Sequence, residues 1–170
     1  YSIEKIALPA TVDHQVGGLT TLSDGRIAAC FDSGEVLFYD PESKGWSEFA
    51  RGLMCPLGLL EEPSGSLLVM QWSELTRLSD TDKDGKADFY ETVCDDFGIT
   101  GNYHEFAYGP ARDDEGNLYI ALNVASNNGG VFKNVRGPWS PIGLAKELMD
   151  VPNGKRIADE SKKQAGRMYS

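Results

Sequence analysis

The chain has 170 residues, of which 41% are hydrophobic and 25% charged, a composition typical of an ordered soluble chain with its own core. Its formal net charge of −10 has the same sign as a phosphate backbone, so nucleic-acid binding is not expected. No apolar stretch approaches the roughly 20 residues that a helix needs to span a bilayer, so the chain is not expected to be membrane-spanning.

A weak internal repeat organises the first part of the chain. Three segments share one order, in which a short apolar strand, a glycine-containing turn and a second apolar strand follow one another, as in a β-hairpin. The turn glycines are Gly25, Gly65 and Gly116. Their spacings, about 40 and about 50 residues, are close to the repeat of a β-propeller with four strands per blade.

The predicted strands cover residues 17–22, 27–31, 35–39 and 46–50, then 57–60, 67–70, 75–78 and 89–93, and finally 106–110 and 118–122. They group into blades near 17–50, 57–97 and 105–132, so residues 1–134 are predicted to form an all-β, partial β-propeller. Propellers close with about four to eight blades, and three blades would leave sheet edges open. We therefore expect a processed or excised front part of a longer propeller. The alternatives are closure by self-association and a smaller all-β fold.

Residues 135–170 lack apolar periodicity and are predicted to form an irregular or short-helical tail, either an inserted loop or a truncated continuation. Pro138 and Pro141 interrupt regular structure near its start, and residues 142–150 could form a short helix. We expect this tail to contribute little to the core.

The three cysteines, Cys30, Cys55 and Cys94, lie far apart and lack the C-x-x-C spacing of a zinc or redox site. We interpret them as small buried apolar residues, which is the usual environment of a free cysteine. They leave the redox compartment undecided.

The sharpest local motif lies at residues 80–91, which match the calcium-loop pattern D-x-[DN]-x-[DN]-G-x₅-E in full. In this pattern Gly85 permits a tight turn and Lys86 offers its backbone carbonyl. The predicted metal-binding residues are Asp80, Asp82, Asp84, Lys86, Asp88 and Glu91. Because these carboxylates would repel one another, we expect the loop to need a divalent cation to order.

Calcium is favoured over magnesium because a cage of protein oxygens suits the larger and less geometrically demanding ion. The residues that flank the motif are predicted to be strands, whereas an EF-hand has two helices. We therefore expect a structural calcium loop on a β-hairpin and no switching role. The alternative is a solvated acidic turn without a metal.

A second candidate is His104, which lies two residues before the first strand of the third repeat. A histidine entering the innermost strand of a blade would lie near the central channel, where propellers usually place ligands. As a neutral imidazole it could take a proton from an alcohol near neutral pH. The alternative is a structural histidine that forms a hydrogen bond to a neighbouring blade.

Three sequence elements together resemble a known family. They are residues 52–59 (GLMCPLGL), residues 74–78 (ELTRL) running into the aspartate loop, and His104 followed by Gly109-Pro110 and residues 116–120 (GNLYI). This combination is similar to the quinoprotein sugar dehydrogenase-like, or sorbosone dehydrogenase-like, β-propellers, in particular their secreted branch in planctomycete-type bacteria. The resemblance covers roughly residues 17–122.

The resemblance implies a six-bladed propeller that binds pyrroloquinoline quinone (PQQ), often with calcium, and oxidises a sugar or a sugar-derived alcohol or aldehyde. In that family a histidine matching His104 is the catalytic base that takes the proton as hydride passes to the quinone. The resemblance also implies a secreted or periplasmic protein. The family's cofactor-clamping residues lie in later blades, so the cofactor-binding residues of this chain are unknown.

Two functional hypotheses follow. The first is the N-terminal portion of a quinoprotein dehydrogenase, with His104 as base and a structural calcium loop. The second is a non-catalytic, calcium-stabilised propeller that binds a glycan or a protein partner.

Overall fold

The computed structural model describes residues 1, 3–97, 99 and 106–123, which contain ten β-strands in three antiparallel sheets and no helix. The all-β class is therefore confirmed for these residues. His104, the tail at 135–170 with its predicted helix at 142–150, and the end of the third predicted blade lie outside the described residues. In the described part of the chain, no helix is long and apolar enough to cross a membrane.

Within each sheet, the strands are neighbours in the order in which they occur in the chain. The first sheet has the order β1 (Val16–Thr21), β2 (Ile27–Phe31), β3 (Val36–Asp40) and β4 (Gly45–Ala50). The second has the order β5 (Leu59–Glu61), β6 (Leu67–Met70), β7 (Leu75–Ser79) and β8 (Phe89–Cys94). The third pairs β9 (Ala107–Arg112) with β10 (Leu118–Leu122). The strands thus lie where the sequence repeat predicts them.

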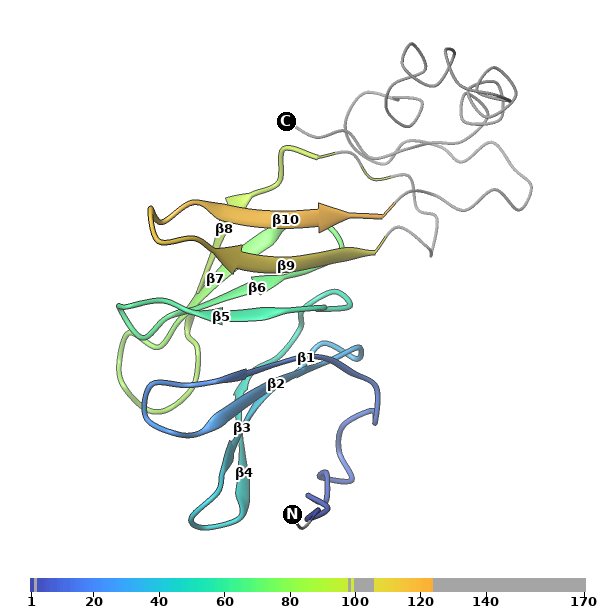
Figure 1. Cartoon of the computed structure of the whole chain (residues 1–170), viewed down its shortest axis with the longest axis vertical. Helices are drawn as coiled ribbons and strands as arrows, with labels where there is room; N and C mark the ends of the chain where they lie inside the picture. The colour runs from blue at the N-terminus through green and yellow to red at the C-terminus, as the bar shows by residue number, and fades with distance from the viewer. Residues whose placement is uncertain (2, 98, 100–105, 124–170) are drawn as a thin grey trace, which may run out of the picture.

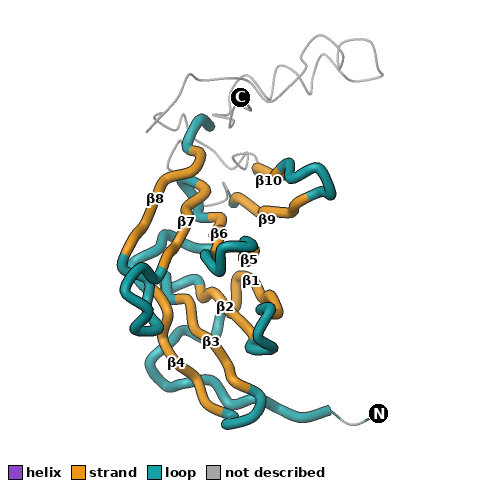
Figure 2. Tube along the Cα trace, turned by 90° about the vertical axis from the view of Figure 1, so that its left-hand side faces the viewer, coloured by secondary structure: helices purple, strands orange, loops and turns teal. Residues whose placement is uncertain are grey.

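The three sheets are stacked on one another, and their first strands lie on the same side of the stack (Figures 1 and 2). Strand β5 contacts both β1 and β9. The last strands, β4 and β8, lie at the opposite side of the stack (Figure 2). In the described residues the stack is open, since the sheets do not close into a ring.

Both faces of β6 in the second sheet are buried, which explains why this strand is a run of four apolar residues with no alternation. Leu67 and Val69 pack with residues of the first sheet, including Phe38 and Phe49. The intervening residues, Leu68 and Met70, point the other way and pack with Ala107 and other apolar residues near the third sheet. The second sheet therefore shares one hydrophobic cluster with each neighbour.

Glycines let the first strands of the three sheets approach backbone to backbone. A Cβ atom placed on Gly18 would lie 2.8 Å from the Cα of Gly58, and one placed on Gly58 would lie 1.8 Å from the carbonyl oxygen of Gly109. No side chain fits at such a separation, because real Cβ contacts with backbone atoms are longer than 3.0 Å. These glycines are therefore required by close approach between sheets.

The N-terminal segment covers the face of the first sheet that is turned away from the second. Val12 is buried there with Ala29, Phe31 and Leu37, and Leu8 packs against the same cluster. The indole N–H of Trp46 donates a 2.9 Å hydrogen bond to the carbonyl oxygen of Ala7. This end of the stack is thus closed by the chain itself.

The cysteines form no disulfide. Cys30 is fully buried, as predicted, and its thiol donates a 3.3 Å hydrogen bond to the carbonyl oxygen of Pro56. Burial raises the pKa of this thiol to about 11. Cys55 and Cys94 are only partly buried, so the prediction of buried cysteines is confirmed for Cys30 alone.

Replacing Gly58 with alanine tests the contact between the first strands. The added methyl group would meet the Gly109 carbonyl at 1.8 Å, so the sheets must separate. We expect the free energy of unfolding to fall by about 3 kcal/mol or more, at the upper end of overpacking costs. Gly45→Ala is the control, because its only close neighbour is the flexible Ser43 side chain, and it should change the free energy by less than about 1 kcal/mol. Equal effects in urea unfolding would disprove the close-approach role.

Candidate metal centre

The predicted calcium loop is the turn that joins β7 to β8. The last register pair before the turn is Ser79 with Phe89, and the amide of Asp88 donates a 3.0 Å hydrogen bond to the carbonyl oxygen of Ser79. The turn lies at the same end of the stack as the hairpin turns between β1 and β2 and between β9 and β10 (Figure 1). A regular hairpin therefore presents the loop to solvent.

Three of the predicted metal-binding residues come together in this loop. Asp80, Asp82 and Asp84 each place a carboxylate oxygen within 4.8 Å of the others. Asp80 is half-buried, whereas Asp82 and Asp84 are exposed. Like charges at this separation repel, although solvent weakens the repulsion. A divalent cation between the three oxygens would convert the repulsion into attraction, and oxygen ligands are those that calcium prefers.

Backbone amides hold the carboxylates in this arrangement. The amides of Lys83 and Gly85 donate to the two oxygens of Asp80, at 2.7 and 2.9 Å, and the amide of Asp84 reaches Asp82 at 3.2 Å. The amide of Lys86 donates to Asp84 at 2.9 Å. Gly85 adopts a φ of 91°, in the left-handed region that favours glycine. The loop backbone thus folds around Asp80, as the position of Gly85 in the motif predicts.

The other predicted ligands are placed differently. The carboxylate of Asp88 accepts hydrogen bonds from the hydroxyl and the amide of Thr81, at 2.5 and 2.7 Å, and these bonds lower the pKa of Asp88. Glu91 lies within β8, directly across from Arg77, and forms an ion pair with it. Lys86 contributes its backbone to the loop, while the cluster of carboxylate oxygens contains neither Asp88 nor Glu91.

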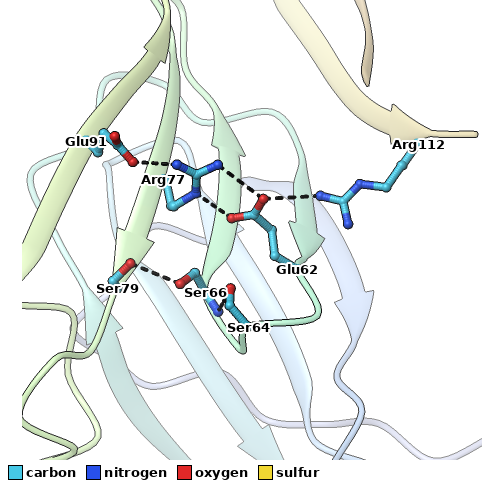
Figure 3. A network of polar contacts seen from close by, with 7 residues as sticks. All are labelled: Glu62, Ser64, Ser66, Arg77, Ser79, Glu91 and Arg112. Carbon is cyan, nitrogen blue, oxygen red and sulfur yellow. Dashed lines mark hydrogen bonds and ion pairs between the residues drawn. The ribbon is translucent and has the colours of Figure 1, made fainter. Parts of the chain in front are cut away.

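Arg77 is the centre of a charged network that the sequence analysis did not identify (Figure 3). Its guanidinium binds Glu62 at 2.5 Å and Glu91, and Glu62 in turn binds Arg112 of β9 at 3.3 Å. The hydrogen bonds to Glu62 and then to Glu91 raise the pKa of Arg77. The network therefore fixes Glu91 on β8 and connects the second sheet to the third. The pairing of Arg77 with Glu91 follows from hairpin register, a signal that the motif alone does not contain.

The loop also contacts the first sheet. The amide of Ala87 donates a 2.7 Å hydrogen bond to the carbonyl oxygen of Phe49 in β4, and the Ala87 side chain packs against the cluster shared by the first two sheets. The hydroxyl of Tyr90 lies 3.3 Å from both the amide nitrogen and the carbonyl oxygen of Arg51. An ion that orders this loop would therefore also order the contact between β4 and β8.

A buried polar network occupies the opposite end of the second sheet. Gln71 accepts a 2.6 Å hydrogen bond from the amide of Met54 and donates one of the same length to the hydroxyl of Thr76. Glu74 accepts hydrogen bonds from the hydroxyls of Thr76 and Thr92. These bonds fasten the connection between β4 and β5 to the second sheet. The predicted catalytic residue His104 belongs in sequence to the next such connection, between β8 and β9, but lies outside the described residues.

Comparison of the chain with models of protein families and with curated protein sequences found no match.

Replacing Arg77 with methionine tests the charged network. The substitution leaves Glu62, whose side chain is only 13% exposed, with Arg112 as its remaining cationic partner. We expect the free energy of unfolding to fall by about 1–3 kcal/mol at neutral pH, since a largely buried carboxylate loses charge-assisted hydrogen bonds. Arg51→Met is the matched control, because its pair with Glu48 is exposed, and it should cost less than about 1 kcal/mol. Similar losses in both variants would argue against a special role for Arg77.

Proposed function

We propose that this chain is a calcium-stabilised part of a β-propeller, in which a structural ion at Asp80, Asp82 and Asp84 holds two neighbouring sheets together. The observation that carries the proposal is the convergence of these three carboxylates in a loop whose backbone also binds the neighbouring sheet through Ala87 and Phe49. Asp88 and backbone carbonyl groups of the loop are near in sequence and, with water, would complete the six to eight oxygens of calcium.

The propeller assignment rests on the repeat of four-stranded antiparallel sheets with their first strands side by side. In a propeller these first strands line the central channel, and the sheets are blades. The close glycine contacts between β1, β5 and β9 favour this arrangement, because blades approach one another most closely near the axis. In a propeller of this kind, the ends of the strands would form the surface that binds a glycan or a protein partner.

Calcium titration of the wild type and of Asp84→Asn tests the metal site. We expect calcium to raise the free energy of unfolding of the wild type by about 2.7 kcal/mol at a concentration one hundred times the dissociation constant. Asp84→Asn removes one anionic ligand without changing its shape and should lose most of this stabilisation. Magnesium should stabilise the wild type less, since it requires stricter octahedral geometry.

Asp114→Asn is the control for this titration, because Asp114 is an exposed carboxylate in another turn. It should keep the full calcium response, measured as the thermal unfolding midpoint in calcium against chelator. A calcium response in Asp84→Asn equal to that of the wild type would remove the loop from the metal site.

A second candidate function is that of a quinoprotein dehydrogenase-like protein, which rests on the resemblance at residues 52–59, 74–78 and 104–120. Strands β4 and β8 end, and strands β5 and β9 begin, at one common end of the stack, and His104 lies between β8 and β9 in sequence. In this candidate function His104 would take a proton from a substrate alcohol as a general base. The substrate would be a sugar or a sugar-derived alcohol or aldehyde, and the protein would be secreted or periplasmic.

The described residues do not by themselves fit PQQ. This cofactor carries three carboxylates and requires cationic partners. Among the described residues of the first strands β1, β5 and β9, the one cation is Arg112, and it already pairs with Glu62 at the turn end of the stack. A complete quinone site would therefore need cations from other parts of a whole propeller.

Thermal unfolding with calcium or chelator, each with and without PQQ, separates the two candidates. We expect calcium to raise the unfolding midpoint of this chain and PQQ to add no further rise, because the described first strands carry no unpaired cation. A PQQ-dependent rise would place a quinone site on this chain. In a whole propeller with dehydrogenase activity, His104→Ala should abolish PQQ-dependent dye reduction and leave the calcium response intact. Retained turnover would rule out His104 as the base.

A further inference from the structure

Two Asp–Gly sequences occur in the chain, at residues 24–25 and 84–85. Both lie in exposed turns, the first between β1 and β2 and the second in the aspartate loop between β7 and β8. An aspartate that precedes glycine is open to an intramolecular reaction, because glycine has no side chain to shield its amide nitrogen. The two turns differ in the partners that hold the reacting groups.

The turn at Asp84 brings the reacting groups close together. The carboxylate of Asp84 accepts a 2.9 Å hydrogen bond from the amide of Lys86, two residues further on, so it lies beside the intervening Gly85 peptide. A Cβ atom built on Gly85 would meet no atom within 4 Å. Packing against the described residues therefore does not hinder attack by the Gly85 nitrogen on the side-chain carboxyl carbon of Asp84.

A hydrogen bond to Asp80 opposes this attack. The amide of Gly85 donates to the carboxylate of Asp80 at 2.9 Å, which fixes the plane of the peptide that joins Asp84 to Gly85. The nitrogen can attack only when this plane turns toward the Asp84 side chain. Asp80 is itself half-buried and also accepts the amide of Lys83 at 2.7 Å. Its hold on the peptide is therefore anchored independently of Asp84.

The other Asp–Gly sequence is held by the hairpin that contains it. The carboxylate of Asp24 binds the side chain of Arg26 at 2.7 and 2.8 Å. The amide of Gly25 donates a 3.0 Å hydrogen bond to the carbonyl oxygen of Leu22, whose own amide is bonded to the carbonyl oxygen of Arg26. Turning this peptide would disrupt the end of the hairpin, whereas turning the one at Gly85 disrupts contacts within an exposed loop.

We propose that Asp84 is a site of isoaspartate formation and that Asp80 restrains the reaction. The nitrogen of Gly85 bonds to the side-chain carboxyl carbon of Asp84, and the carboxyl hydroxyl group leaves with the amide proton as water. Water then cleaves the bond between this nitrogen and the main-chain carbonyl carbon of Asp84, so the chain continues through the former side chain. Nothing is oxidised or reduced, and the mass of the chain is unchanged.

The consequence for the loop rests on the proposed function. Isoaspartate adds a methylene group to the main chain and carries its free carboxylate directly on Cα, so the oxygens of Asp84 would leave the metal site. An ion bound by Asp80 and Asp84 would in turn hold both groups and slow the reaction, because metal binding opposes opening of the loop. Calcium would then set how long the site remains intact.

Incubation of the full chain in chelator at neutral pH tests the proposal. Digestion with a protease that cleaves before aspartate but not before isoaspartate, followed by mass spectrometry, measures both sites in one sample. Asp84 should convert several-fold faster than Asp24. Asp80→Ala should raise the rate at Asp84 about tenfold or more, since a hydrogen bond to a charged group is lost and the loop opens more often. The rate at Asp24 should not change, which shows that the fold is retained.

Asp82→Ala is the matched control, because Asp82 belongs to the same carboxylate cluster but accepts the amide of Asp84 and not that of Gly85. It should accelerate the reaction less than Asp80→Ala. Equal rates in the two variants, an unchanged or lower rate in Asp80→Ala, or wild-type conversion no faster at Asp84 than at Asp24 would overturn the proposal.

Added calcium separates this proposal from the proposed function. We expect calcium to slow conversion of Asp84 in the wild type and to leave the rate at Asp24 unchanged. If calcium changes neither the rate at Asp84 nor the unfolding midpoint while the effect of Asp80→Ala persists, the calcium site is wrong and the isomerisation site stands.

Discussion

The close approach of the first strands is the constraint on which the rest of the structure depends. Gly18, Gly58 and Gly109 bring the backbones of neighbouring sheets into contact at one side of the stack. Because β-sheets twist, sheets that touch along their first strands diverge toward their last strands. Apolar side chains fill the space near the contact, as the clusters around Val69 and Met70 show. The space between β4 and β8 then has to be filled by other means.

The aspartate loop occupies this diverging side of the first two sheets. Its Ala87 reaches β4 by a backbone hydrogen bond, and Tyr90 contacts the backbone of Arg51 just beyond that strand. Backbone contacts of this kind depend on the loop holding one conformation, and three adjacent carboxylates oppose that order unless a cation joins them. In the proposed function, an ion bound in this loop would therefore stabilise the side of the stack that the glycine contacts leave open.

Much of the fold could be predicted from the sequence, because glycine-containing turns separate the strands. The apolar pattern of each strand also lies within a few consecutive residues. Turn glycines such as Gly25 and Gly65 have positive φ angles, and the strands begin and end close to the predicted residues. The N-terminal segment could not be predicted to pack on the first sheet, since its contacts through Leu8 and Val12 have no periodicity and depend on a face formed elsewhere. The glycines at 18 and 58 were recognised as strand or motif residues, but their role in contacts between sheets is visible only in three dimensions.

The candidate site was predictable to the extent that it is local. Asp80, Asp82, Asp84 and Gly85 act within one turn, so their spacing is sufficient to place them together. In an EF-hand a following helix returns the last glutamate of the motif to the ion. Here the motif continues into β8, and an extended strand carries Glu91 away from the turn at about 3.3 Å per residue. Its neighbour is then chosen by strand register, which pairs it with Arg77.

The two ends of the strands differ in chemistry, and this difference separates structural from binding roles. At the turn end, Glu61 binds Ser23 of the preceding sheet and Glu62 binds Arg112 of the following one. Two adjacent acidic residues thus connect the second sheet to both of its neighbours. The aspartate loop lies at this same end. Charged groups that are paired with one another, or would be paired with an ion, have few hydrogen-bonding positions left for a ligand. The opposite end contains the connection from β4 to β5, and connections carried by a rigid scaffold are where binding residues concentrate. In the proposed propeller, a glycan or protein partner would therefore be expected at this end and not at the turn end.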